Sequence, residues 1–201
     1  MTEPRPVSPL RVYLAGPDVF LAGALDLAAR KKALCARYGF AGVFPLDKSL
    51  DLAGLTPRDR GLAIARANER LMDGCDLMVA HMTPFRGPGM DGGTAFEMGY
   101  MRAQGKPVLG YSNVPLGFFE RVAAAHGCRE RAGDGHGFED GDGLAIENFG
   151  LVDNLMLDGA VIASGFEIAT AAVPAGALYT DLTAFERCLA MAAARFGVAA
   201  G

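Results

Sequence analysis

The chain has 201 residues, 51% of them hydrophobic, so a single domain with a substantial core is expected. Its formal net charge is −4 and its pI is about 5.4, which argues against a nucleic-acid polymer as partner, because phosphates call for a basic patch. The apolar runs are too short to span a bilayer, so no membrane partner is expected. Segment 1–10 is polar and proline-rich without a signal-peptide core, and we expect it to be flexible.

Apolar runs and helical patterns alternate along most of the chain. Such alternation implies a parallel sheet covered by helices on both faces, and four or five strands with a ligand crevice predict a flavodoxin-like doubly wound α/β fold. The expected elements are strands at Arg11–Ala15, Gly42–Leu46, Asp76–His81 and Val108–Tyr111, a fifth strand at Phe166–Ala171, and helices at Ala22–Tyr38, Pro57 to about Gly74, Thr94–Gln104, Asn154–Ala163 and after Asp181.

The helix that begins at Pro57 has the start signal of a threonine cap at Thr56. Helical spacing predicts an inward stripe that contains one polar residue, Asn68, which is as consistent with a satisfied core amide as with a ligand contact. The stripe consists of Gly61, Ile64, Asn68, Leu71, Met72 and Cys75. Later in the chain, the segment 127–143 holds six glycines and five acidic residues, which favours a mobile loop over a second domain.

The stretch 75–111 is the one around which the rest is organised. A strand ending at His81 is followed by a loop rich in proline and glycine, Met82–Gly93, and then by a helix. Ligands of an open parallel sheet bind beyond the carboxyl ends of its strands. We expect Asp91 at the mouth of that crevice and Glu97 in the first turn of the helix. Two carboxyl groups that converge on a crevice suggest chemistry at a sugar carbon.

Each of these residues also has a purely structural interpretation. Thr94 and Glu97 have the spacing of a capping box, and the two roles of Glu97 are compatible. Tyr13 either points its hydroxyl at the crevice or serves as a core aromatic. The phosphate-binding glycine motifs of P-loop and dinucleotide proteins are absent, and the histidines, cysteines and loop aspartates lack metal-ligand spacing. We therefore expect neither a cofactor nor a metal, and free thiols in a reducing cytoplasm.

Five motifs together resemble the nucleoside 2-deoxyribosyltransferase family over most of residues 11–195. They are YLAGPDVF, the Cys–Asp pair at 75–76, PFRGPGMDGGTAFEMGY, GKPVLGY and DNLM. Members exchange the base of a 2′-deoxyribonucleoside through a covalent deoxyribosyl-enzyme. The resemblance implies a nucleophile at Glu97, a proton donor to the base at Asp91 and an orienting hydroxyl at Tyr13. It also implies substrate contacts at Gly16, Asn68, Phe85 and Gly93, and contacts in a neighbouring subunit's site at Asn154 and Met156.

The chemistry of base exchange fits the two carboxyl groups independently of the resemblance. Displacing a base from the anomeric carbon passes through an oxocarbenium-like transition state, and retention needs a carboxylate nucleophile about 5 Å from a second carboxyl group. Asp91 must be protonated to donate, which a dry pocket beside another carboxylate favours. Where some members carry an aspartate that contacts the base, this chain has Asn68, so purine and pyrimidine use both stay open.

The resemblance thus implies a cofactor-free cytoplasmic homo-oligomer of nucleotide salvage, acting on deoxyribonucleosides and free purine or pyrimidine bases. One alternative is a 2′-deoxynucleoside 5′-monophosphate N-glycosidase. Such a hydrolase needs phosphate ligands near the first loop and the nucleophile, where this chain has Asp18 and Asp91. The other alternative is a nucleotide-binding module without catalysis, in which a reactive Glu97 would have no use.

Overall fold

The computed structural model describes residues 8–131 and 137–198. Its centre is a five-stranded sheet in the order β2-β1-β3-β4-β8, in which each neighbouring pair is parallel. The predicted doubly wound α/β fold is confirmed, including its fifth strand, which spans two residues. The strands are β1 (Arg11–Ala15), β2 (Ala41–Val43), β3 (Leu77–His81), β4 (Val108–Ser112) and β8 (Ala169–Thr170).

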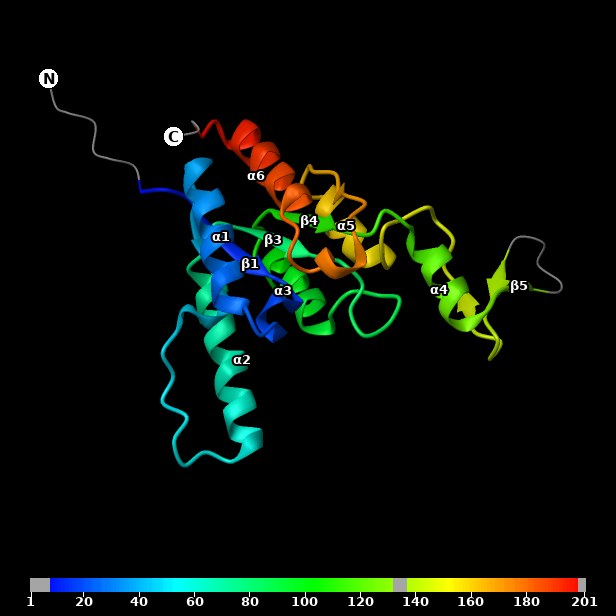
Figure 1. The fold of residues 1–201 in the computed structure, drawn as a ribbon, viewed down its shortest axis with the longest axis horizontal. Coiled ribbons are helices and arrows are strands. Elements are labelled where there is room, and N and C mark those ends of the chain that lie inside the picture. Colours follow the sequence, from blue (N-terminus) through cyan, green and yellow to red (C-terminus); the bar gives the residue numbers. More distant parts are fainter. Residues whose placement is uncertain (1–7, 132–136, 199–201) are drawn as a thin grey trace, which may run out of the picture.

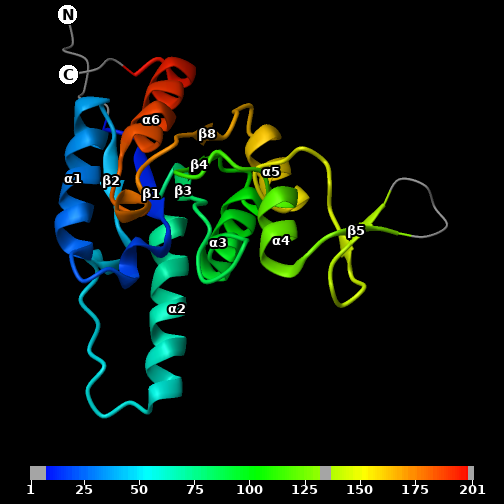
Figure 2. The same ribbon diagram turned by 45° about the vertical axis from the view of Figure 1, so that its right-hand side comes forward.

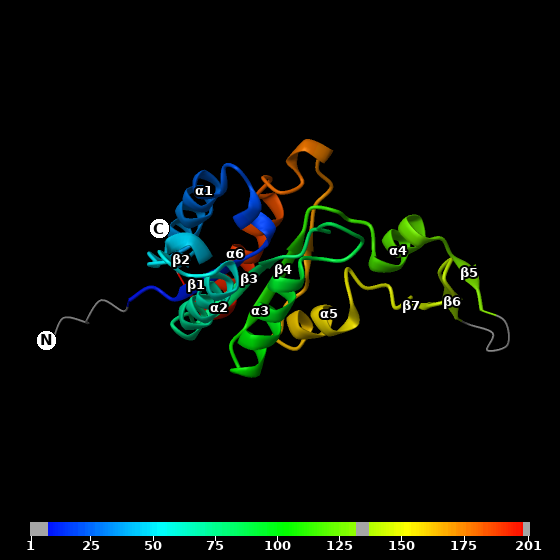
Figure 3. The same ribbon diagram turned by 90° about the horizontal axis from the view of Figure 1, so that it is seen from below.

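Helices cover both faces of this sheet (Figures 1 and 3). Helices α1 and α6 lie on one face, and α2, α3 and α5 lie on the other. None of the helices within the described ranges is long and apolar enough to cross a membrane. The helices are η1 (Pro17–Phe20), α1 (Ala24–Arg37), η2 (Pro45–Asp47), α2 (Pro57–Asp73), α3 (Gly92–Ala103), α4 (Phe118–His126), α5 (Leu155–Ile162), η3 (Ala175–Ala177) and α6 (Thr183–Phe196).

Helix α2 begins as predicted, because Thr56 accepts a hydrogen bond from the Asp59 amide at 3.2 Å and Pro57 follows it. The predicted inward stripe is wrong in its first half, where Ile64 is 40% exposed. Figure 2 shows the reason: the first half of α2 extends beyond the sheet. The residues that α2 buries are Ala67 and Met72.

Helix α4 and a small antiparallel sheet extend from the β4 end of the body (Figures 1 and 3). The sheet consists of β5 (Arg129–Glu130), β6 (Phe138–Glu139) and β7 (Ala145–Ile146), and Phe138 packs on Phe119 of α4 with ring centroids 4.9 Å apart. The glycine-rich segment 127–143 therefore contains two short strands rather than one irregular loop. Its residues 132–136, like residues 1–7 of the N-terminal segment expected to be flexible, lie outside the described residues.

A chain of polar side chains is buried at the carboxyl ends of β1 and β3. Asp18 and Lys31 form an ion pair in which neither side chain is more than 1% exposed. The other carboxylate oxygen of Asp18 lies 2.7 Å from Nδ1 of His81, and Nε2 of His81 lies 2.7 Å from the Thr83 hydroxyl. That hydroxyl accepts from the Asn113 amide at 2.9 Å, so its proton is free to be donated to His81. His81 is thus a neutral structural residue, and burial lowers its pKa.

The same chain changes one expectation about the crevice. Asp18 was expected near the site, where its charge would repel a phosphate, but its carboxylate is fully buried and paired. Burial alone would raise the pKa of Asp18, but Lys31 and His81 outweigh it and lower the pKa to about 2. The charge of Asp18 is therefore neutralised inside the fold, and it does not count against phosphate binding in the crevice.

Substitution Lys31→Met should destabilise the protein strongly, because it leaves the Asp18 carboxylate buried without its cation. We expect a loss of about 3–5 kcal/mol in the free energy of unfolding, measured by urea titration at pH 7. The matched control is Arg37→Met, which removes an exposed ion pair with Glu186 and should cost less than about 1 kcal/mol.

The same ion pair predicts how stability depends on acid. The folded-state pKa of Asp18 lies below its ordinary value of 3.8. The contribution of this carboxylate to the free energy of unfolding is therefore present above pH 3.8 and is lost as the pH falls toward 2. Wild-type protein should lose this part of its stability between about pH 4 and pH 2. Equal losses in Lys31→Met and Arg37→Met at pH 7 would contradict this account.

Candidate active site

A hydrogen bond between β1 and α3 defines the site. The Tyr13 hydroxyl donates to Oε1 of Glu97 at 2.6 Å. The ring of Tyr13 is fully buried in β1, whose neighbour β3 leads into α3. Both interpretations of Tyr13 therefore hold in part: its ring belongs to the core, and its hydroxyl reaches the carboxylate.

Asp91 is the N-cap of α3. Its Oδ2 accepts from the Thr94 amide at 2.8 Å and from the Thr94 hydroxyl at 2.9 Å. The predicted capping box with Thr94 as its first residue is therefore wrong. Aspartate is a strong N-cap and the two glycines after it adopt helical geometry, so the helix begins at Gly92 and Glu97 lies in its second turn.

The environment of Glu97 favours its protonated form more than water does. Burial raises the pKa of Glu97 to about 7, and the nearby Asp91 adds to this effect, whereas the Tyr13 hydrogen bond and the charge of Lys48 oppose it. Lys48 follows η2 and was not singled out by the sequence. A carboxyl group that titrates near neutral pH is a common feature of active sites.

Glu97 lines a cavity of about 190 Å³ between α2 and α3. Two residues expected to contact substrate, Asn68 and Gly93, line it as well. A Cβ atom added at Gly93 would come within 3.1 Å of Oδ2 of Asp91, so glycine keeps this corner open. The remaining wall is formed by Ala65, Glu69, Met72 and Phe96. The structure thus brings Tyr13, Asp91, Glu97, Asn68 and Gly93 together.

Phe85 and Gly16 lie in the loops around this centre. Phe85 stacks on Phe20 of η1 with ring centroids 5.3 Å apart, and the guanidinium of Arg86 lies 4.7 Å from the Phe85 ring. A Cβ atom at Gly16 would approach Cβ of His81 to 2.6 Å, so glycine allows β1 and β3 to end side by side. A substrate contact at either position stays a prediction.

Arg121 of α4 holds the loop that leads to Asp91, a role that no motif in the sequence indicated. Its Nε donates to the Pro88 carbonyl at 2.7 Å, and its Nη2 donates to Oδ2 of Asp153 at 3.0 Å. The same oxygen accepts from the Met90 amide at 3.1 Å. Asn154, the residue after Asp153, caps α5, and its side-chain oxygen accepts from the Met156 amide at 3.1 Å.

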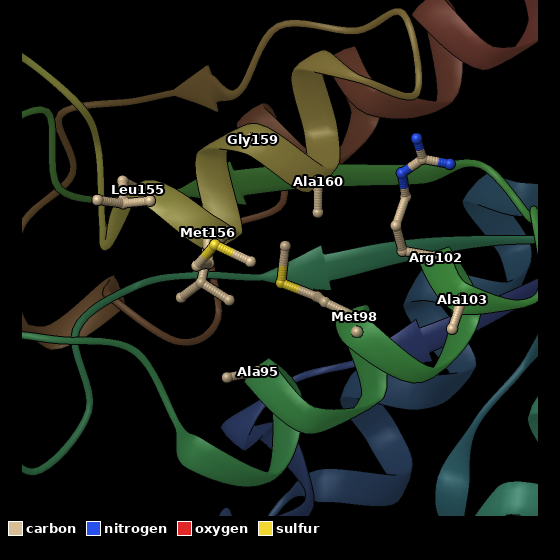
Figure 4. Close-up of a pocket in the computed structure, with 10 residues that line it drawn as sticks. Ala95, Met98, Arg102, Ala103, Leu155, Met156, Gly159 and Ala160 are labelled. Carbon is tan, nitrogen blue, oxygen red and sulfur yellow. The ribbon is translucent and has the colours of Figure 1, made fainter.

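Asn154 and Met156 do not reach the cavity of Glu97 in the same chain. Met156 is 72% exposed and lines a groove of about 640 Å³ between α3 and α5. Figure 4 shows Met156 and Met98 pointing toward each other across this groove, with Ala95 and Ala160 at its sides. This face of α3 is opposite to the one that carries Glu97 and Phe96.

The described part of the chain holds no group of three or more His, Cys, Asp or Glu side chains placed to bind a metal ion. Its described cysteines, Cys35, Cys75, Cys128 and Cys188, are all free thiols.

A family model and a solved structure point to the same family. The family model described as nucleoside 2-deoxyribosyltransferase matches residues 12–156. An uncharacterised protein of Schizosaccharomyces pombe is 37% identical over 164 residues, which cover 77% of this chain and 78% of that protein. A solved structure of a 2-deoxyribosyltransferase from Leishmania mexicana is 31% identical, with a TM-score of 0.57, and the match covers 74% of this chain and 85% of that one.

Substitution Tyr13→Phe should raise the pKa of Glu97, because it removes the hydrogen bond that stabilises the ionised form. A hydrogen bond to a charged group contributes about 1.5–3 kcal/mol, which corresponds to a rise of about 1–2 in the pKa. The measurement is a ¹³C-carboxyl NMR titration of the free protein. Tyr100→Phe is the control, because the Tyr100 hydroxyl donates to Asp73 at 2.8 Å on the surface. An unchanged titration of Glu97 in Tyr13→Phe would contradict the assignment.

Proposed function

We propose that this chain, which belongs to the nucleoside 2-deoxyribosyltransferase family, exchanges the base of 2′-deoxyribonucleosides through a deoxyribosyl–Glu97 intermediate. The observation that carries the proposal is the arrangement of Glu97, hydrogen-bonded to Tyr13 and close to Asp91, beside a cavity of about 190 Å³. This exchange reuses preformed bases, so we assign the enzyme to nucleotide salvage in the cytoplasm.

In the first half-reaction, an oxygen of Glu97 forms a bond to C1′ of the sugar while the bond from C1′ to the base nitrogen breaks. The bonding electrons leave with the base, and Asp91 supplies the proton that neutralises it. In the second half-reaction, a nitrogen of the incoming base attacks C1′, Glu97 leaves as a carboxylate, and Asp91 recovers the proton. Two inversions retain the configuration, and atoms and charge balance without any cofactor.

In each of the two carboxyl groups, one oxygen is held by hydrogen bonds and the other is available for the reaction. Tyr13 engages Oε1 of Glu97, so Oε2 is the oxygen available for attack. Thr94 engages Oδ2 of Asp91, so Oδ1 is the oxygen available to carry the transferred proton. Ionised Glu97 also stabilises the positive charge that develops on the sugar in the transition state.

The lining of the cavity suits a flat base better than a sugar. Phe96 and Met72 supply apolar surface, while Asn68 supplies a neutral amide. A deoxyribose has two free hydroxyl groups that need several hydrogen-bond partners when buried, whereas a base offers a broad apolar face and polar edges. We therefore assign this cavity to the base and Asn68 to recognition of its edge.

We further propose that the enzyme is a homo-oligomer with shared sites. Met156 lies on the opposite side of α3 from Glu97, at the start of the helix that Asn154 caps, so we assign their substrate contacts to another copy of the chain. The apolar groove between α3 and α5, with Met156 and Leu155 exposed by 72% and 40%, supplies a surface that such a contact would cover.

Substitution Glu97→Gln should abolish exchange without unfolding the protein. A neutral amide is a poor nucleophile and cannot balance an oxocarbenium charge, so kcat should fall at least ~1000-fold, which corresponds to ~4 kcal/mol. The melting temperature should change little, because Asp91 rather than Glu97 caps the helix. The assay incubates enzyme with deoxyinosine and free adenine and resolves the products chromatographically.

The control is Glu186→Gln, the same change on the far face of the sheet, which should keep wild-type exchange. Mass spectrometry of wild-type enzyme quenched with a slow 2-fluoro-deoxynucleoside should find the sugar on the peptide that contains Glu97. Label on Asp91, or near-normal exchange by Glu97→Gln, would refute the assignment. Free deoxyribose as the sole product would make the enzyme a hydrolase, and no product at all would support a binding module.

A mixing experiment tests the shared sites. Chains with Glu97→Ala and chains with Asn154→Ala should each be inactive alone, because one lacks the nucleophile and the other lacks the group given to its neighbour. After subunit exchange, a randomly mixed dimer would regain about a quarter of wild-type activity, since half of the molecules are mixed and each has one complete site. A mixture that stays inactive despite proven exchange of subunits would contradict the proposal.

A further inference from the structure

We infer that Lys48 is a positioning residue that holds the Asn68 amide with its NH₂ group toward the cavity, so that the site favours bases with a hydrogen-bond acceptor at that edge. The inference rests on the proposed function, because it takes the cavity beside Glu97 as the place of the base. It concerns a residue that lies outside every motif in the sequence.

The contacts of Lys48 place it between the end of η2 and the helix that carries Asn68. The ammonium group of Lys48 hydrogen-bonds Oδ1 of Asn68 and lies 3.4 Å from the Ile64 carbonyl, one turn earlier in α2. Lys48 is partly buried, and burial lowers its pKa while Glu97 opposes that effect. The cation therefore lies next to the site rather than in open solvent.

This contact decides the orientation of the amide. An asparagine side chain has an oxygen that accepts and a nitrogen that donates two protons, and a flip exchanges them. An ammonium group has only protons to donate, so only Oδ1 can face Lys48. Within residues 8–131 and 137–198, no hydrogen-bond partner is seen for Nδ2 of Asn68, and Asn68 lines the cavity. The NH₂ group is therefore the part of the amide left for the ligand.

An NH₂ group at the cavity distinguishes bases by the group that faces it. The carbonyl oxygen of a 6-oxopurine accepts its hydrogen bond, whereas the exocyclic amine of adenine presents a second donor and leaves both groups unpaired. A buried polar group without a partner costs enough for a preference of ~10-fold or more. Without Lys48, the amide is free to flip and can satisfy either base.

The test is a competition between hypoxanthine and adenine at equal concentrations, with deoxyguanosine as the sugar donor. Wild-type enzyme should form deoxyinosine at least ~10-fold faster than deoxyadenosine. Lys48→Met should bring this ratio to within about 3-fold, because the amide then has no fixed orientation. Lys48→Arg, which keeps a donor-only cation, should retain most of the preference.

Lys32→Met is the matched control. Lys32 forms an ion pair with Asp47, the residue before Lys48, so this variant also removes a lysine that holds the η2 turn but does not touch Asn68. Its product ratio should equal that of wild type. A ratio that Lys48→Met leaves unchanged, or that Lys32→Met alters equally, would overturn the inference.

Calorimetric titration of the free bases separates this inference from the proposed function, since no reaction occurs without a sugar donor. Wild type should bind hypoxanthine more tightly than adenine, and Lys48→Met should lose that difference. If binding behaves this way but wild type forms no deoxyinosine or deoxyadenosine, base exchange is refuted and the role of Lys48 stands. If exchange occurs but wild type binds both bases equally, the role of Lys48 is refuted and base exchange stands.

Discussion

The hydrogen bond from Tyr13 to Glu97 joins the first strand to the helix that follows β3, at a distance of 2.6 Å. It requires β1 and β3 to lie side by side, which the doubly wound sheet provides because β1 pairs with β2 on one edge and with β3 on the other. The crevice of such a fold opens where the connections diverge. The site is therefore a consequence of strand order, and the position of Glu97 depends on the core that holds Tyr13.

That core ends in a layer of paired charges rather than in apolar side chains. Asp18, Lys31 and His81 close the carboxyl ends of β1 and β3 from the face that carries α1 and α6, while Glu97 lies on the other face. The pKa of Glu97 is set by its burial and by Tyr13, Asp91 and Lys48, which lie around its own carboxyl group.

The sequence predicted what depends on local pattern and missed what depends on distant pairs. The parallel sheet covered by helices followed from the alternation of strands and helices, and the convergence of Asp91 with Glu97 followed from the position of the loop. The choice of Asp91 over Thr94 as the cap did not, because both residues have capping chemistry and the backbone decides between them. The roles of Lys48 and Arg121 could not be predicted for another reason. Lys48 contacts a partner about 20 residues away and Arg121 one about 30 residues away, and no sequence-spacing rule connects such pairs.

Helix α3 carries Glu97, the proposed nucleophile, on one face and borders the apolar groove with the other, so in the proposed oligomer a single helix serves both the chemistry and the contact between copies. Arg121 adds a second link. Through the Pro88 carbonyl and Asp153 it fixes the loop that leads to Asp91, and Asp153 directly precedes Asn154. If Asn154 serves a neighbour as proposed, Arg121 and Asp153 together position Asp91, the proposed proton donor of their own site, and the contact residue of the next site. A displacement of the loop that leads to Asp91, or of the segment that holds Asp153 and Asn154, would then change the geometry of both sites, because Oδ2 of Asp153 accepts from both Met90 and Arg121.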